Sequence, residues 1–184
     1  GHTTKQYDIR HCWPNLSRMI VEPLKEHNVE ILLSTYKVND ENIEKEIYDI
    51  IKPNIKYISD IDINSSNSRT TKFAMFNLLE NKDYDFVIMT RTDLHFSKNI
   101  KEMNIDYNKF NFLFLEKYHR DINLTCDNFY AWPYRMTKDV EQAFKKCPQL
   151  NSHDTHQLFH SLSNIISIED IHYISGQEKH LSDV

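Results

Sequence analysis

The chain of 184 residues contains only two glycines, Gly1 and Gly176. Dinucleotide-binding fingerprints, Walker phosphate loops and nucleophile elbows each require several glycines within one short segment. These three kinds of site are therefore excluded. Tight turns must use asparagine and aspartate instead, because these residues adopt left-handed backbone angles more readily than other non-glycine residues.

Short apolar segments alternate with amphipathic segments along the chain. Strands are predicted at residues 29–36, 55–58, 85–90, 110–115, 129–132, 165–168 and 171–174, and helices at residues 15–25, 40–51, 68–80, 137–146 and 154–162. In the first half, strands and helices follow each other in the order typical of βαβ units. We therefore expect a single α/β domain over residues 1–184, with a mixed, mostly parallel sheet flanked by helices.

The composition excludes several classes of partner. Hydrophobic residues make up 40% and charged residues 27%, which is ordinary for a globular domain. No apolar run approaches the length of about 18 residues needed for a membrane span. The net charge is −5, whereas a nucleic-acid binder usually carries a basic excess, so no nucleic-acid partner is expected. The three cysteines show no C-x-x-C spacing, which favours a reducing, cytoplasmic compartment.

The segment that follows the predicted strand 85–90 carries the most chemical information. Arg91 and Asp93 are two residues apart, so in an extended chain their side chains point to the same side. In α/β sheets, ligands bind outside the carboxyl ends of strands. Asp93 could hold a hard divalent cation there, and Arg91 could bind phosphate oxygens. The alternative is an ion pair that closes a surface turn.

Residues 84–96, YDFVIMTRTDLHF, resemble the strand and the D-x-D-type element of GT-A glycosyltransferases. The R-x-D form resembles small glycosyltransferase domains of large algal DNA viruses and related bacterial polysaccharide enzymes. This resemblance implies a Rossmann-like GT-A fold whose first strand would lie upstream of Gly1. It also implies transfer of a hexose from a nucleotide-diphosphate donor, expected to be a UDP-sugar, to a glycan acceptor with Mn²⁺ or Mg²⁺, and a role in viral or bacterial glycan synthesis.

Two further segments resemble donor-binding parts of the same family. Residues 31–36 resemble the second strand, whose end meets the nucleotide base, which implies Thr35 and Tyr36 as donor-binding residues. Residues 68–72 resemble the helix start that approaches the nucleotide-sugar. Arg69 and Lys72 lie one helical turn apart there and could share the diphosphate, or form a solvated basic helix edge.

An inverting transfer needs a carboxylate base beside the acceptor hydroxyl, whereas a retaining one does not. Asp154 is the first candidate, because residues 153–155 resemble the acidic helix start that often carries the base. Asp127 is the second, within residues 126–130, which resemble the acceptor-side segment. Asp154 could instead cap a helix, and Asp127 could form an Asx turn.

Other interpretations stay open at this point. The main alternative is a non-catalytic α/β domain that binds a nucleotide or a carbohydrate. A nucleotidyltransferase or phosphohydrolase would need a second carboxylate beside Asp93. His156 and His160 have a spacing that can bind zinc, but no third ligand is evident. The aromatic residues of the acceptor-side region could stack on a sugar or pack in the core; they are Phe129, Tyr130 and Trp132.

Overall fold

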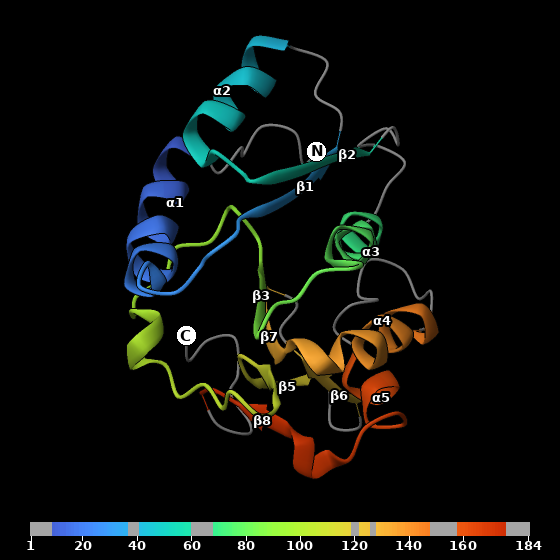
Figure 1. Ribbon diagram of the computed structural model, residues 1–184. Helices are drawn as coiled ribbons and strands as arrows, with labels where there is room; N and C mark the ends of the chain where they lie inside the picture. Colours follow the sequence, from blue (N-terminus) through green and yellow to red (C-terminus); the bar gives the residue numbers. More distant parts are fainter. Residues whose placement is uncertain are drawn as a thin grey trace. The chain divides into compact units, whose positions relative to one another are not determined.

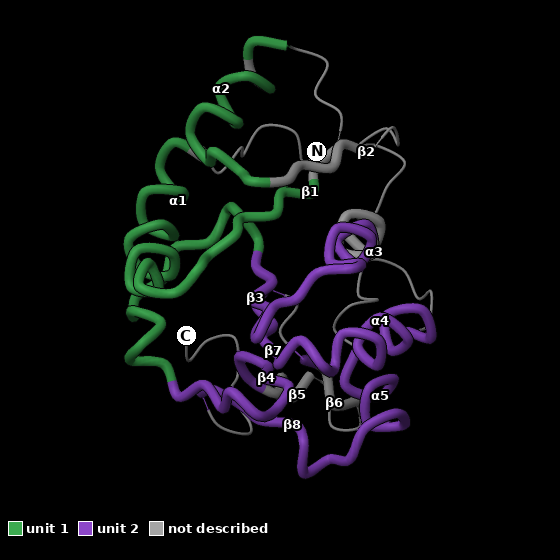
Figure 2. The backbone as a smooth tube through the Cα atoms, in the orientation of Figure 1, with its two compact units in different colours: residues 1–66, 91–103 green, residues 67–90, 104–184 purple. Residues whose placement is uncertain are grey.

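A computed structural model describes residues 9–36, 41–59, 68–118, 122–125, 128–147 and 158–175 of the chain. Its strands and helices make it a mixed α/β protein (Figure 1). The chain forms two compact units, which are coloured in Figure 2. Unit 1 comprises residues 1–66 and 91–103, and unit 2 comprises residues 67–90 and 104–184. That both belong to one domain, as the sequence suggests, stays a prediction.

Unit 1 contains one strand–helix–strand unit. Strand β1 (Leu32–Tyr36) is followed by helix α2 (Glu41–Ile51) and strand β2 (Ile55–Ser59). The two strands pair in parallel, from Leu32 opposite Ile55 to Tyr36 opposite Ser59. A parallel pair needs a crossover, and α2 supplies it. The parallel arrangement expected from the strand–helix alternation is confirmed for this pair.

The helical segment at the start of unit 1 begins earlier than residues 15–25. Helix α1 (Ile9–Leu16) includes Pro14 and continues as a π-helical turn (Ser17–Val21) and a 3-10 turn (Glu22–Leu24). Cys12, Leu16 and Ile20 are buried. Residues four apart lie on one helical face, so this apolar stripe supplies part of the core of unit 1.

Unit 2 contains a four-stranded sheet in the order β3-β7-β4-β8. Its strands are β3 (Phe86–Thr90), β7 (Phe129–Pro133), β4 (Phe110–Phe112) and β8 (Ile171–Tyr173). β7 runs antiparallel to both β3 and β4, and only β4 and β8 are parallel. The described sheet is therefore mostly antiparallel, and the expectation of a mostly parallel sheet is wrong.

The error has a physical cause. Strand–helix alternation indicates a parallel crossover only when successive strands join the same sheet. Helix α3 (Ser68–Leu79) leads from β2 to β3, but β2 pairs with β1 whereas β3 pairs with β7. A further antiparallel pair, β5 (Leu115–Tyr118) with β6 (Ile122–Thr125), was not predicted. Strand partners are set by contacts between distant residues, which local periodicity does not reveal.

The core of unit 2 is aromatic. All five residues of β7 are buried, which is typical of an internal strand covered on both faces. Six aromatic side chains are at most 1% exposed: Phe110, Phe112, Phe129, Tyr130, Trp132 and Phe144. Helix α4 (Thr137–Lys146) lies between α3 and α5 (Leu158–Leu162) in Figure 1. The aromatic residues of β7 are therefore core residues, and the alternative of sugar stacking does not hold for them.

Ring contacts connect the helices to the sheet. Phe76 of α3 lies 5.4 Å from Phe144 of α4 and 6.4 Å from Trp132 of β7, measured between ring centroids. Trp132 also stacks on Phe110 of β4, with a centroid distance of 5.7 Å. Such aromatic pairs each contribute about 0.5–1.5 kcal/mol beyond the burial of their area. Sheet and helices thus share one continuous aromatic layer.

Among the described residues, two non-glycine residues have left-handed backbone angles at helix ends. Lys52 follows α2 with φ of 49°, and Asn81 lies shortly after α3 with φ of 59°. Glycine is the usual residue where the chain turns out of a helix with a positive φ. Asn81 agrees with the expectation that asparagine or aspartate replaces glycine in such turns, whereas Lys52 does not.

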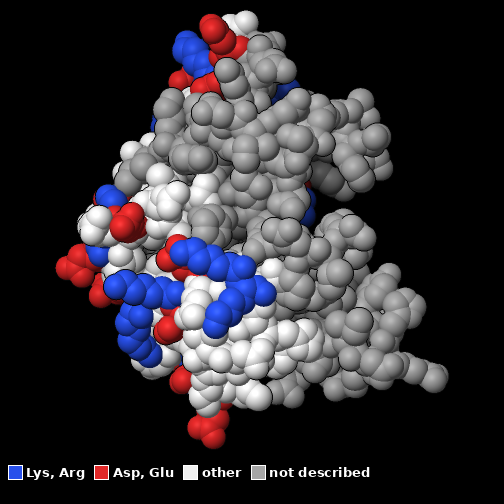
Figure 3. Space-filling model, turned by 90° about the vertical axis from the view of Figure 1, so that its right-hand side faces the viewer, with Lys and Arg blue, Asp and Glu red and all other residues white. Residues whose placement is uncertain are grey.

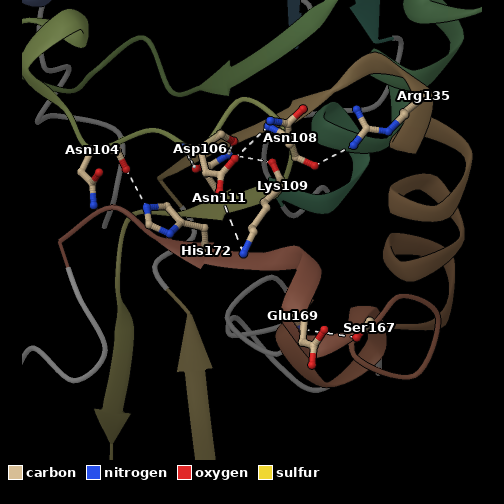
Figure 4. Close-up of polar contacts among 9 residues, drawn as sticks. All are labelled: Asn104, Asp106, Asn108, Lys109, Asn111, Arg135, Ser167, Glu169 and His172. Carbon is tan, nitrogen blue, oxygen red and sulfur yellow. Dashed lines mark hydrogen bonds and ion pairs between the residues drawn. The ribbon is translucent and has the colours of Figure 1, made fainter.

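A fully buried asparagine fixes the loop that precedes β4 (Figure 4). The Asn111 side chain is 0% exposed. Its Oδ1 accepts from the Asp106 N–H at 2.8 Å, and its Nδ2 donates to the carbonyl oxygens of Asp106, Lys109 and Ala131. Arg135 adds a bond from its Nη2 to the Asn108 carbonyl oxygen at 2.7 Å. A polar side chain can be buried this deeply because all its groups have partners.

Charged side chains of both signs lie together on the described surface. Figure 3 shows Lys and Arg side chains gathered at the left of the view, with Asp and Glu side chains beside them. In unit 2, Lys145 pairs with Glu141 at 2.7 Å, and Lys109 with Asp106 at 4.0 Å. Exposed ion pairs of this kind contribute about 1 kcal/mol or less to stability. They therefore contribute little to the stability of unit 2.

Candidate functional site

Strand β3 delivers the segment that carries the candidate site. Val87 and Met89 alternate as buried residues along the strand. At its carboxyl end, the Thr90 hydroxyl donates to the Asn128 carbonyl oxygen at 3.1 Å. Residues 91–103, which follow directly, belong to unit 1. The end of β3 is thus fixed by packing and by a hydrogen bond immediately before the chemically informative residues begin.

The side chains of Arg91 and Asp93 form an ion pair with each other at a turn that includes Thr92 and Asp93, which is the geometry of the alternative interpretation. Arg91 Nε donates to Asp93 Oδ1 at 2.9 Å, and Arg91 Nη2 donates to Asp93 Oδ2 at 2.6 Å. This two-pronged contact is the strongest geometry that a guanidinium and a carboxylate can form. The Arg91 side chain is 47% exposed and that of Asp93 is 28% exposed, so a ligand in solution can reach both.

Asn15 of α1 fastens the same segment from a distance of 81 residues in sequence. The Phe96 N–H donates to Asn15 Oδ1 at 2.6 Å, and Asn15 Nδ2 donates to the Phe96 carbonyl oxygen at 3.0 Å. Asn15 is 5% exposed and Phe96 is 8% exposed. The asparagine amide thus serves both backbone groups of one residue, three positions after Asp93. This clamp restricts where the Arg91–Asp93 turn can move.

The far end of the segment is also held. Asn99 accepts from the Lys101 N–H at 2.9 Å and caps the 3-10 turn Ile100–Glu102. Lys101 Nζ contacts Glu26 Oε1 at 2.5 Å. Lys101 lowers the pKa of the exposed Glu26 carboxyl, mainly through the hydrogen bond and in addition through its positive charge. Ile100, which lies between Asn99 and Lys101 in the sequence, is 1% exposed.

Asn15→Ala should lower the free energy of unfolding by about 2–3 kcal/mol, because the clamp serves two buried backbone groups of Phe96 and each lost partner costs about 1–3 kcal/mol. Urea denaturation followed by circular dichroism measures the change. The matched control is Asn77→Ala, since Asn77 is exposed on α3. There the better helix propensity of alanine should raise stability by a few tenths of a kcal/mol. Equal stabilities of the two variants would show that Asn15 clamps nothing.

Thr35 and Tyr36 end strand β1 as the sequence predicts. They pair with Ile58 and Ser59 at the carboxyl ends of the parallel strands. Arg69 and Lys72 lie in the first turns of α3, again as predicted. The structure describes the backbone of these four donor-binding candidates, and their roles stay predictions.

Both candidates for the catalytic base, Asp127 and Asp154, lie outside the described residues. Helix α5 begins its described part at Leu158, and Leu158 and Leu162 are fully buried, as expected for the helix predicted at residues 154–162. His156 lies outside the described residues as well. The structure therefore tests neither the base assignments nor the zinc alternative through His156.

Histidines in the described part of the chain have ordinary surroundings. His172 Nε2 bonds the Asn104 carbonyl oxygen at 2.7 Å, which fixes its ring in Figure 4. His95 is exposed. Within residues 9–175, apart from the undescribed gaps, no three or more His, Cys, Asp or Glu side chains gather in a way that could hold a metal ion.

Asn15 is the residue of this site that sequence reasoning missed. It lies among apolar residues of α1, with Cys12 and Leu16 buried beside it in sequence. A polar residue on the apolar stripe of a helix is the signal that could have indicated a buried hydrogen-bonding role. Nothing in the sequence names Phe96 as its partner.

No protein-family model, no curated protein and no solved structure matches this chain. A functional proposal therefore depends on the chain's own residues. In the described part of the chain, no helix is long and apolar enough to cross a bilayer.

Proposed function

We propose that the chain is a glycosyltransferase of the GT-A type, which transfers a hexose from a UDP-sugar to a hydroxyl of a glycan acceptor. The observation that carries the proposal is the contact between Arg91 and Asp93, directly after β3. A nucleotide-sugar with its divalent cation presents both a phosphate and a metal ion. A guanidinium and a carboxylate held side by side are complementary to that combination.

Arg91 is proposed to bind the diphosphate, because its planar guanidinium matches two phosphate oxygens at once. Asp93 is proposed to hold Mn²⁺ or Mg²⁺. Its donor set fits, since such cations usually take only one or two protein carboxylates and complete their shell with water and substrate oxygens. When bound, the cation neutralises charge that develops on the leaving diphosphate.

The remaining roles come from the resemblance to GT-A glycosyltransferases. Thr35 and Tyr36 are proposed to contact the nucleotide, and they belong to unit 1 together with Arg91 and Asp93. Arg69 and Lys72 are the proposed further contacts to the diphosphate. Asp154 is the proposed base of an inverting transfer, with Asp127 as the second candidate.

Release of UDP tests the enzymatic proposal. The protein is incubated with UDP-glucose, UDP-galactose or UDP-N-acetylglucosamine and Mn²⁺, with and without a mixture of glycan acceptors, and free UDP is followed by ³¹P NMR. We expect at least one donor to be consumed, and a chelator to stop its consumption. Binding of UDP without any turnover would instead indicate the non-catalytic nucleotide-binding domain. Neither binding nor turnover would overturn both interpretations.

A further inference from the structure

The exposed side of helix α4 carries basic residues at both of its ends, although the whole chain has a net charge of −5. Four exposed basic residues, which we call the basic row, lie on this helix and on the 3-10 turn before it: Arg135, Lys138, Lys145 and Lys146. Lys138 follows Arg135 by three positions and precedes Lys145 by seven, and these spacings keep side chains on one side of a helix. The acidic residues between them, Asp139 and Glu141, are less exposed.

Helix stability explains only half of the basic row. The carboxyl end of a helix carries a partial negative charge, which favours Lys145 and Lys146 in the last turn of α4. Arg135 and Lys138 lie at the opposite end, where the partial positive charge of the helix disfavours a cation. An anionic partner would offset this unfavourable placement.

An exposed aromatic ring lies beside the basic row. Tyr107 is 54% exposed, and its ring packs against Phe86 of β3 with 5.0 Å between the ring centroids. The loop that carries Tyr107 is held on both sides, because the Asn111 side chain forms hydrogen bonds with the backbone of Asp106 and of Lys109 (Figure 4). A ring that is already held in place loses little conformational freedom when a ligand stacks on it.

Arg135 connects the aromatic ring to the basic row. Its Nη2 donates to the carbonyl oxygen of Asn108, the residue that follows Tyr107, at 2.7 Å (Figure 4). The Arg135 guanidinium therefore lies against the loop that presents the ring, and Lys138 lies about one helical turn further along the chain. All of these residues belong to unit 2.

We propose that Tyr107 and the basic row form a binding surface for an acidic polysaccharide, whose sugar rings carry carboxylates. The apolar face of one sugar stacks on Tyr107, and the carboxylates of neighbouring sugars pair with Arg135 and with the lysines of the row. The inference goes beyond the proposed function and does not depend on it, since the Arg91–Asp93 segment takes no part in this surface.

Charge density favours such a polymer over a nucleic acid. A DNA duplex carries one negative charge per ~1.7 Å of its length. A chain with a net charge of −5 repels so dense a charge, whereas a polysaccharide with at most one carboxylate per sugar is charged less densely. The geometry of α4 disfavours an anionic membrane. The apolar residues Val140, Ala143 and Phe144 are fully buried in the core, so this helix has no free apolar face to insert into lipid.

Binding to polygalacturonate tests the proposal. Its methyl ester is the matched control, because it has the same backbone without the negative charges. Fluorescently labelled protein is titrated with each polymer, without nucleotide, at low and at moderate ionic strength. We expect saturable binding to polygalacturonate that weakens as salt is added, and at least about fivefold weaker binding to the ester. Equal binding of the two polymers, tighter binding of single-stranded oligothymidylate, or no binding of polygalacturonate would overturn the proposal.

Variants of the surface locate the binding. Lys138→Gln should weaken binding to polygalacturonate about two- to fivefold, because it removes one charge from the row. Tyr107→Ala should weaken it about two- to tenfold, and Tyr107→Phe, which keeps the ring, should bind like the wild type. Lys45→Gln is the matched control for charge, since Lys45 is exposed on α2 in unit 1.

Two results with these variants would overturn the proposal. One is an equal loss of affinity in Lys138→Gln and Lys45→Gln, which would show attraction to positive charge anywhere on the chain. The other is an unchanged affinity in Tyr107→Ala, which would show that no sugar stacks there. Because the titration contains no nucleotide, its outcome is separate from the outcome of the UDP-release assay, which bears on the proposed function alone.

Discussion

Asp154→Asn should reduce the rate of sugar transfer by about 10²–10⁴-fold, the usual contribution of a general base. The affinity for UDP should stay unchanged, because a base faces the acceptor hydroxyl and not the diphosphate. The positive end of the helix dipole would keep Asp154 ionised at the start of the predicted helix 154–162. The rate of UDP release with saturating donor and acceptor measures the effect.

The alternative for Asp154 makes the opposite prediction. Asparagine and aspartate are equally good helix caps, so a capping residue tolerates this substitution without loss of stability or activity. A transfer rate close to that of the wild type would therefore eliminate Asp154 as the base. Asp127→Asn, tested in the same assay, would then show whether the second candidate takes that role.

Asp93→Asn should abolish the strengthening of UDP binding by Mn²⁺. Asparagine lacks the negative charge that holds a hard cation, so the UDP affinity with Mn²⁺ should fall to that measured without it. The fold should be unaffected, since the exposed pair with Arg91 is worth about 1 kcal/mol or less. Isothermal titration gives the affinity, and thermal unfolding gives the stability.

A matched variant controls for the loss of a carboxylate in general. Asp83→Asn removes an exposed carboxylate just before β3 and should leave the Mn²⁺ effect on UDP intact. If Asp93→Asn binds UDP with Mn²⁺ as tightly as the wild type does, Asp93 has only a structural role.

Local patterns predicted the elements that have strong periodicity. The apolar segment 85–90 contains β3, and the helix predicted at residues 137–146 matches α4 (Thr137–Lys146). Both succeed because the apolar pattern that indicates each element lies within one short window of the sequence. The strand predicted at residues 165–168 is wrong: Ile165 and Ile166 donate backbone hydrogen bonds to Leu162 and close a turn after α5. These hydrogen bonds to the preceding helix set the backbone conformation of Ile165 and Ile166, although isoleucine has a high β propensity.

The arrangement of the sheets could not be predicted in the same way. Strand β7 pairs with β3 and β4. Beside the pairing with β3, the Thr90 hydroxyl bonds to the carbonyl oxygen of Asn128, which lies 38 positions later in the sequence. Pairing over such separations depends on the packing of Trp132 and its aromatic neighbours, which no window of sequence contains. Expecting parallel strands from alternation alone was therefore correct for β1 and β2 and wrong for β3.

The candidate site, like the fold, could be predicted from the sequence only in part. That Arg91 and Asp93 directly follow a strand could be predicted, and an ion pair between them at a surface turn was one of the two interpretations that the sequence left open. That they pair through two hydrogen bonds required the structure. The clamp from Asn15 to Phe96 joins residues that no periodicity relates. Sequence patterns thus located the chemistry, and the structure showed what holds it.

The central claim is that the Arg91–Asp93 segment serves a nucleoside diphosphate together with a divalent cation. Isothermal titration of the wild-type chain with UDP, with and without Mn²⁺, tests this claim most directly, and uridine is the control that lacks the diphosphate. We expect saturable UDP binding in the presence of Mn²⁺, with a dissociation constant between about 1 μM and 1 mM, the range of typical enzyme–substrate affinities. Binding should be weaker without Mn²⁺ and absent for uridine at the same concentrations. No UDP binding under either condition, or equal binding of UDP and uridine, would contradict the claim.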